Sequence, residues 1–139
     1  MTKINVLFDI VNSIKNNYTK NHKFAYCSNS KFALRLLYAL YKEGLISGFK
    51  VESMAKIKIK LKYYRNKSLL ENIVVLYKPS LKKIASKNEI SKQLSNYDIL
   101  FISTNAGLIS SKDFSNLASS NQEVGGIILL GVKLMNKLI

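Results

Sequence analysis

The sequence lacks several features that would point to particular protein classes. Its 139 residues contain a single cysteine, Cys27, so the chain alone can form no disulfide and no multi-cysteine metal site. No apolar stretch approaches the roughly 20 residues that span a bilayer. The N-terminus shows neither a signal-peptide pattern nor an Arg-rich amphipathic leader. We therefore expect no membrane segment, no secretion and no import.

Acidic residues are also scarce, and they do not cluster. The eight Asp and Glu stand singly, whereas metal-assisted or acid–base chemistry on nucleic acid needs grouped carboxylates or a general base. The only histidine, His22, lies close to Cys27, and such a pair can activate a thiol. No third orienting group accompanies the pair, so we expect Cys27 to be a small core residue. The sequence predicts no enzyme, no cofactor, no metal and no small-molecule substrate.

Positive charge is what the sequence has in excess. Twenty-two Lys and Arg against eight Asp and Glu give a formal net charge of +14. A polyanion relieves such self-repulsion, and nucleic acid is the usual one. All of the basic residues except Arg35 and Arg65 are Lys. Lysine contacts phosphate as a point charge and lacks the bidentate hydrogen bonds that arginine makes to guanine. We therefore expect the protein to recognise the shape and the sugar-phosphate backbone of a nucleic acid more than its base edges. A basic membrane-surface protein is the competing interpretation, but no segment is both strongly amphipathic and Lys-clustered.

Apolar periodicity predicts a regular N-terminal half. Apolar residues at helical spacing indicate two amphipathic helices, the second capped by the polar cluster 28–30 and ended by Gly44. Short apolar or alternating runs between and after them indicate strands. The predicted elements are helix Lys3–Tyr18, strand Phe24–Cys27, helix Lys31–Lys42, and a hairpin of Lys50–Ser53 with Lys56–Tyr64.

The strand Lys56–Tyr64 alternates strictly between lysine and apolar residues. Its lysines Lys56, Lys58, Lys60 and Lys62 would share one face, and the apolar residues between them would be buried on the other. The lysines could contact phosphate. They could equally prevent an exposed sheet from pairing edge to edge with another chain. The sequence leaves both interpretations open.

The C-terminal half is predicted to contain more strand than helix. A polar stretch, Arg65–Glu71, is the best place for a boundary, which divides the chain into residues 1–66 and 67–139. The predicted elements are strand Asn72–Leu76, helix Asn88–Leu94 capped by Asn88, strand Ile99–Ile102, helix Lys112–Ser119 capped by Ser110 or Ser111, and strand Ile127–Val132. The fold class is therefore α/β of the α+β kind.

A polar turn, Ser103–Gly107, follows the apolar run Ile99–Ile102, and a glycine pair, Gly125–Gly126, precedes the last strand. Hydroxyls and an amide at such a turn can donate to phosphate oxygens and accept from ribose hydroxyls. The glycines would allow a close approach of backbone. An ordinary turn and an ordinary strand entry explain the same residues, and spacing alone favours that interpretation.

Motifs in both halves together resemble the small-subunit ribosomal protein S-eight family. That family shows Ser-Thr-x-x-Gly with two aliphatic residues, then a short helix, Gly-Gly and a closing strand. Its second helix begins after Ser-Lys and ends in Lys-Glu-Gly-x-Ile. The residues that carry the resemblance are Ser103–Ile109 with Gly125–Gly126, Ser30–Lys31 with Lys42–Ile46, Ile14–Asn16, and Tyr77–Lys83.

The resemblance covers nearly the whole chain and implies a fold and a function. The implied fold is two small α/β domains packed on each other: helix-strand-helix-strand-strand, then a part that is mostly β. The implied function is binding of the central domain of small-subunit ribosomal RNA during assembly, beside other small-subunit proteins. The implied RNA-binding residues are Ser103, Thr104, Asn105, Ala106, Gly107, Gly125, Gly126, Lys78, Pro79, Ser80, Lys82, Lys15, Asn16, Ser30 and Lys31.

The chain departs from the family pattern at several of these places. Asn105 and Ala106 replace the usual Ser and Lys or Arg, and Ile127 stands where the family has Glu after Gly-Gly. Ile84 stands where an aromatic residue is expected. The alternative interpretation is a free-standing RNA-binding module or translational regulator of similar fold.

Composition also bears on where the protein works. Lys, Asn, Ile and Tyr are heavily used, whereas Arg is nearly absent and Trp is absent. A/T-rich codons produce this bias. Together with the degenerate motif, it predicts a protein encoded and made inside a mitochondrion. A plastid or an A/T-rich bacterium is the alternative.

Overall fold

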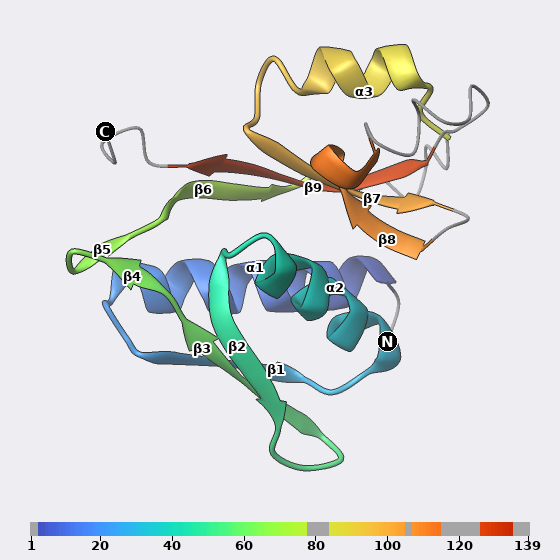
Figure 1. Cartoon of the computed structure of the whole chain (residues 1–139). Coiled ribbons are helices and arrows are strands. Elements are labelled where there is room, and N and C mark those ends of the chain that lie inside the picture. The colour runs from blue at the N-terminus through green and yellow to red at the C-terminus, as the bar shows by residue number, and fades with distance from the viewer. Residues whose placement is uncertain (1–2, 78–83, 105–106, 115–125, 135–139) are drawn as a thin grey trace.

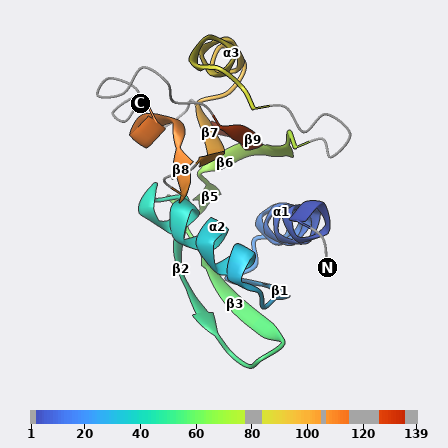
Figure 2. The same ribbon diagram turned by 90° about the vertical axis from the view of Figure 1, so that its right-hand side faces the viewer.

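Two antiparallel sheets enclose a pair of helices, and a third helix covers the far side of the second sheet (Figures 1 and 2). The computed structural model describes residues 3–77, 84–104, 107–114 and 126–134. The elements are α1 (Lys3–Thr19), β1 (Phe24–Ser28), α2 (Lys31–Lys42), β2 (Ile46–Val51), β3 (Lys56–Leu61), β4 (Tyr63–Tyr64), β5 (Lys67–Ser68), β6 (Leu70–Val75), α3 (Lys87–Gln93), β7 (Ile99–Thr104), β8 (Gly107–Ser110) and β9 (Ile127–Leu134). The predicted α+β class is confirmed.

The first sheet has the order β1-β3-β2, so β3 is its central strand. Alternation along β3 buries Ile57, Ile59 and Leu61 against the helices and turns Lys56 and Lys60 to the open side. Both helices of this half lie where the periodicity predicted them. The predicted capping is also confirmed, because the Ser30 hydroxyl accepts from the Ala33 N–H at 3.1 Å.

The second sheet has the order β6-β9-β7-β8 and is covered on both faces. In β7, Ile99 and Phe101 join the core around α1 and α2, whereas Leu100 and Ile102 pack with Ile90 of α3. This burial on both faces explains why the run Ile99–Ile102 is continuously apolar. The predicted strand is confirmed, and it extends to Thr104.

Several predicted boundaries shift. Helix α3 begins at Lys87, and Ser86 caps it by accepting from the Glu89 N–H at 3.3 Å, so the prediction that Asn88 is the cap was wrong. Strand β2 begins earlier than predicted, at Ile46. Strand β3 ends at Leu61 because the chain turns into a small hairpin of β4 and β5.

The short helix predicted over Lys112–Ser119 is described only in part. Residues 111–114 are helical, and the Ser110 hydroxyl accepts from the Asp113 N–H at 3.4 Å, which confirms Ser110 as a cap. Phe114 in this helical turn is buried. Residues 115–119 lie outside the described residues.

One cluster of buried residues runs through the helix layer and touches both sheets. Leu7 and Ile10 of α1 belong to the same cluster as Ile59 of β3 and Leu130 of β9. The division of the chain into residues 1–66 and 67–139 stays a prediction. Among the described residues, no helix combines the length and the apolar character that a bilayer span requires.

Candidate nucleic-acid interface

The polar residues Ser103 and Thr104 end β7 at the tip of the β7–β8 hairpin. Ser103 pairs with Leu108, and Thr104 pairs with Gly107. The Thr104 hydroxyl donates to the Gly107 carbonyl at 2.9 Å. Gly107 has φ +113 with open space where a side chain would stand, so only glycine adopts this backbone without strain.

The hairpin turn is narrower than predicted. Ser103 also pairs with Ile127 of β9, so the sheet ladder continues through Ser103 and Thr104 instead of ending at Ile102. The connecting residues Asn105 and Ala106 lie outside the described residues. The tip is thus a hydroxyl-bearing strand end held in register by the sheet.

Gly126 makes the close approach of backbone that the glycine pair predicted, but its partner is β7. A Cβ atom on Gly126 would lie 2.5 Å from Ile102 Cγ2 and 2.7 Å from the Ser103 carbonyl oxygen. Gly126 is buried, so the space beside its backbone is filled by the protein itself. This placement fits the ordinary interpretation of a strand entry. Gly125 lies outside the described residues.

The predicted basic residues Lys78, Pro79, Ser80 and Lys82 lie outside the described residues, but both flanks of their segment are described. On one side, the Tyr77 N–H donates to the Leu129 carbonyl at 3.2 Å. On the other side, Ala85 and Gly126 exchange backbone hydrogen bonds of 2.8 and 3.2 Å. Both flanks therefore lie at the end of β9 that pairs with the hairpin tip.

Lys15 and Asn16 are exposed near the end of α1, at the opposite end of the second sheet. Lys15 lines a hollow together with Asn72, and Asn72 pairs with Lys133 of β9. The hairpin tip instead pairs with Ile127, at the other end of that strand. The intervening residues of β9 correspond to roughly 20 Å. The structure does not bring Lys15 and Asn16 to the tip.

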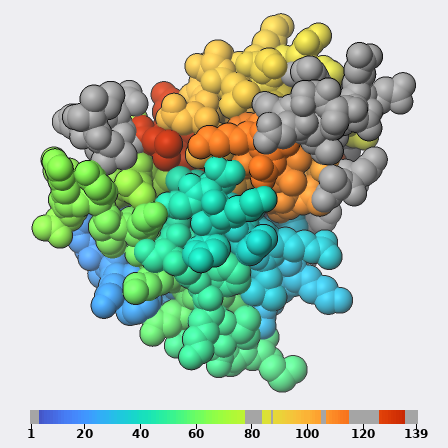
Figure 3. Space-filling view, viewed as in Figure 1, coloured from blue at the N-terminus to red at the C-terminus, as the bar shows by residue number. Residues whose placement is uncertain are grey.

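Ser30 and Lys31 occupy a third place, at the N-terminus of α2. The Ser30 hydroxyl already serves as the helix cap, and Lys31 is exposed. The opposite end of α2 lies against the segment that contains β8 (Figure 3). Lys42 Nζ lies 3.2 Å from Asp113 Oδ2 there. The predicted site residues thus fall into separate places. Among the described ones, Ser103, Thr104, Gly107 and Gly126 form the group that the tertiary structure brings together.

The outer face of the first sheet carries basic and aromatic side chains that are absent from the predicted site. Its members are Lys50, Lys56, Lys58, Lys60, Phe24 and Tyr26, which we call the lysine face. Ammonium groups lie over rings here, with Lys58 Nζ 4.0 Å from the Phe24 centroid and Lys56 Nζ 4.1 Å from the Tyr26 centroid. The lysine alternation was visible in the sequence, but its position beside these rings depends on the pairing of β1 with β3.

The structure offers no activated nucleophile at Cys27. The thiol is buried, and desolvation together with the nearby Asp9 carboxylate raises its pKa to about 12. His22 lies at the far end of β1 and shares a 2.8 Å hydrogen bond with Asn17. The prediction that Cys27 is a core residue is confirmed. Within the described ranges, no group of three potential metal ligands is found.

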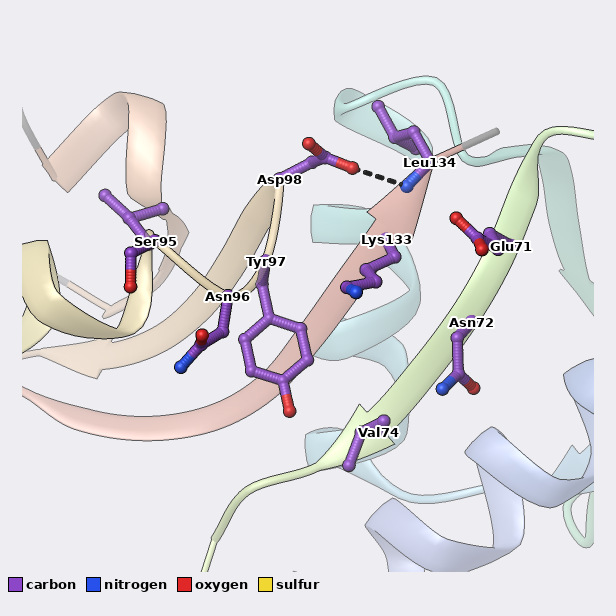
Figure 4. Close-up of a pocket in the computed structure, with 10 residues that line it drawn as sticks. Glu71, Asn72, Val74, Ser95, Asn96, Tyr97, Asp98, Lys133 and Leu134 are labelled. Atoms are coloured by element: carbon purple, nitrogen blue, oxygen red, sulfur yellow. Dashed lines mark hydrogen bonds between the residues drawn. The ribbon is translucent and has the colours of Figure 1, made fainter. Parts of the chain in front are cut away.

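A polar hollow of about 460 Å³ lies between β6, the end of β9 and the turn after α3 (Figure 4). The Tyr97 ring packs on Gly131, where an added Cβ would lie 2.8 Å from the ring. Asp98 Oδ2 accepts from the Leu134 N–H at 2.7 Å. The two carboxylates that line the hollow, Glu71 and Asp98, make it a poor place for phosphate.

Known proteins resemble this chain along nearly its whole length. The family described as "Ribosomal protein S8" matches residues 5–132. "Small ribosomal subunit protein uS8m" of Acanthamoeba castellanii is 29% identical over 131 residues, 93% of this chain and 99% of its own. "Small ribosomal subunit protein uS8" of Mycoplasmopsis pulmonis is 31% identical over 124 residues, 87% and 90% of the two chains. The uS8 protein of Lachnoclostridium phytofermentans is 30% identical over 134 residues, 93% and 97%.

Proposed function

The chain belongs to the ribosomal protein S8 family, and from this premise we propose that it binds the central domain of small-subunit ribosomal RNA through the β7–β8 tip. Family membership implies a structural, non-enzymatic role in the small ribosomal subunit, with ribosomal RNA and other small-subunit proteins as partners. The finer proposal concerns which RNA region is bound and which residues bind it.

One observation carries this proposal: residues far apart in the sequence meet at the same end of β9. The tip residues Ser103 and Thr104 lie there, and so do both flanks of the basic segment 78–83, because Ala85 bonds to Gly126 and Tyr77 to Leu129. Hydroxyl groups at a strand end can bond phosphate and ribose oxygens, and the wide minor groove of an RNA helix exposes both. The buried glycine holds the strands close enough for the tip to keep its shape.

Ile84 adds an apolar group to the same end of the sheet. Its side chain is 67% exposed although it is a large hydrophobic residue, and it directly precedes the Ala85 bridge to Gly126. We include Ile84 among the contacts with the RNA surface. An aliphatic side chain there covers ribose without stacking on a base.

The test is the binding of purified protein to fragments of its own small-subunit RNA. Thr104→Val keeps the side-chain shape and removes the hydroxyl, so we expect about fivefold weaker binding to the central-domain fragment, since one hydrogen bond contributes about 1 kcal/mol. Thr19→Val is the matched control, because Thr19 is exposed at the end of α1 and bonds the Lys15 carbonyl at 2.9 Å. It should leave binding unchanged.

Two outcomes would contradict the proposal. Equal affinity for fragments of other RNA domains would remove the assignment to the central domain. Weaker binding by Thr19→Val but not by Thr104→Val would move the contact to the α1 end, where Lys15 and Asn16 lie. Co-sedimentation with small subunits at high salt supports a subunit component, whereas its loss supports a free-standing RNA-binding protein.

We also propose that the protein works in a mitochondrion. The A/T-driven composition supports this, and so does the likeness to a mitochondrial uS8m, although bacterial uS8 proteins are equally similar. Fractionation of the source cells tests the proposal. Recovery of the protein with mitochondrial small subunits is the expected result. Recovery with plastid or bacterial ribosomes would overturn it.

A further inference from the structure

The lysine face is the open side of the first sheet and lies away from the helix layer (Figure 2). Cross-strand pairing sets Lys58 between Tyr26 of β1 and Lys50 of β2, and sets Lys60 between Phe24 and Gly48. Ala25 and Ile59, which lie between these positions on β1 and β3, point inward and are fully buried. The face is therefore a fixed, half-covered sheet surface with lysines along its middle strand.

The position of these lysines argues against edge protection. Charges that prevent strand addition belong on edge strands, where backbone groups are unpaired. Lys56, Lys58 and Lys60 lie on β3, which is bonded on both sides by β1 and β2. Because β3 has no unpaired edge, its lysines cannot serve to prevent another strand from pairing with it.

The arrangement also places lysines at neighbouring positions on the sheet. Lys50 and Lys58 are direct cross-strand partners, and like charges in such pairs are destabilising. Lysines two residues apart on β3 lie about 7 Å from each other. The ion pairs among the described residues involve Lys42 and Lys112, neither of which is on this face. Two acidic residues lie near the edge of this face: Glu52, whose N–H donates to the Lys56 carbonyl, and Asp9, which lines a hollow with Tyr26 and Lys56.

Aromatic rings beneath the lysines restrict where the ammonium groups lie. Lys58 leans over Phe24 and Lys56 over Tyr26, each toward the neighbouring pair on β1. A lysine held in this way loses less freedom when it binds an anion. A base that stacks on either ring must displace the ammonium group that lies over it. A shallow hollow of about 270 Å³ opens between Lys50, Lys58 and Lys60, where Gly48 has no side chain.

From these observations we propose that the lysine face is a second RNA-binding surface, which holds the ribose-phosphate backbone by charge and does not read bases. The inference rests on the proposed function for its partner, RNA, but it assigns a surface on the first sheet, which lies across the helix layer from the second sheet and its β7–β8 hairpin (Figure 1). The protein would then contact RNA at two separated places.

An acidic protein segment is the other polyanion that could fit, and the composition of the face favours RNA. Protein interfaces are depleted in lysine and enriched in arginine. Carboxylates are bound best by the two parallel N–H groups of an arginine guanidinium, whereas lysine binds phosphate as a point charge. The two arginines of the chain, Arg35 and Arg65, lie on α2 and in the β4–β5 turn, not on this face.

The salt dependence of RNA binding tests the inference. The variant Lys56→Gln/Lys58→Gln/Lys60→Gln removes three charges from the face. Each phosphate contact contributes about 0.7–0.9 to the slope of log affinity against log salt, so the slope should fall by about 2. The loss should be equal for central-domain RNA and for unrelated RNA, because no base is read.

Matched variants separate the surface from net charge. Lys20→Gln/Lys92→Gln/Lys133→Gln removes three exposed lysines elsewhere and should change the slope by less than about 1. Lys56→Arg/Lys58→Arg/Lys60→Arg keeps the charge and should keep the slope. Unfolding curves of all three variants verify that the fold is retained.

The following outcomes would overturn the inference that the lysine face binds RNA. Equal slopes for the two Gln variants mean that the face does not bind RNA. Retained RNA binding with lost association to other small-subunit proteins means that an acidic protein covers it. If the face variant behaves as the control while Thr104→Val weakens binding, only this inference fails. If the unmodified protein binds no small-subunit RNA, the proposed function fails with it.

Discussion

The two sheets of this protein differ in how they are covered, and the difference separates their roles. The β1-β3-β2 sheet packs one face on the helices and leaves the other, with its row of lysines, open. The β6-β9-β7-β8 sheet is packed between the helix layer and α3, and its hydroxyl-bearing tip is at the end of β7. One sheet can therefore present a charged face to RNA, whereas the other can present only an edge or a tip.

The central strands show the same contrast in their sequences. Strand β3 alternates lysine with Ile or Leu, whereas Ile99–Ile102 of β7 has no polar residue. A strand with one covered face needs apolar residues at every second position, and a strand covered on both faces needs them at every position. The apolar pattern of a strand thus reports how many layers cover it.

The largest effect is expected when a buried side chain on either face of β7 is truncated to alanine. Leu100→Ala and Phe101→Ala empty different clusters, and each should destabilise the protein by about 2–5 kcal/mol. Lys58→Ala on the open face of β3 should change stability by less than about 0.5 kcal/mol. Urea unfolding measures all three. A small effect of Leu100→Ala would show that α3 does not cover the second sheet tightly.

Glycines in the two sheets give a second, smaller test. An added Cβ on Gly126 would overlap Ile102 and the Ser103 carbonyl, so Gly126→Ala should destabilise by about 1–3 kcal/mol. Gly48 in β2 has no atom within 4 Å of that position, so Gly48→Ala should stabilise by about 0.5 kcal/mol. Thermal unfolding compares the two. Equal changes would mean that the second sheet relaxes around the new methyl group.

Alkaline pH should destabilise the protein through the buried Cys27 thiol of the first sheet. Because burial raises the pKa of Cys27 from 9.0 to about 12, the native thiol stays protonated where the unfolded one ionises. The contribution of the protonated thiol to the free energy of unfolding is complete below pH 9 and is lost as the pH rises toward 12. At about pH 10 the loss should reach about 1 kcal/mol.

The control for this experiment is Cys27→Ala. Its stability should decline less between neutral pH and pH 10 than that of the unmodified protein. Tyr18, whose pKa is also raised by desolvation, contributes a loss of the same sign in both proteins. Parallel pH profiles would show that the thiol reaches solvent in the native state.

The smallest expected effect concerns the ion pairs between α2 and the residues after β8. Lys42 Nζ lies 3.2 Å from Asp113 Oδ2, and Lys112 Nζ lies 3.9 Å from Glu43 Oε2. The Lys42 and Asp113 side chains are 58% and 35% exposed, so Asp113→Asn should cost only about 0.2–1 kcal/mol, and less at high salt. A double-mutant cycle with Lys42→Gln measures the coupling. Coupling that persists in high salt would contradict a screened surface pair.

Local patterns predicted elements far better than they predicted the site. The helix Lys31–Lys42 and its Ser30 cap follow from residues within a few positions of each other, and both are confirmed. The cap of α3 was misplaced because Asn88 and Ser86 are both good capping residues, and only the backbone conformation at Ser86 decides between them. The predicted site joined residues that share a family motif, but Lys15 and Ser103 lie at opposite ends of the second sheet.

By itself, the sequence determined the α+β class, the two long helices, the alternation along Lys56–Leu61 and the basic charge. These depend on spacing along the chain, which side-chain periodicity reports directly. Only the tertiary structure decided that β3 is the central strand, that its lysines lie over Phe24 and Tyr26, and that Gly126 faces β7. Strand order and cross-strand neighbours depend on pairing between distant segments. The same alternating strand could have formed an edge, where its lysines would have had a different purpose.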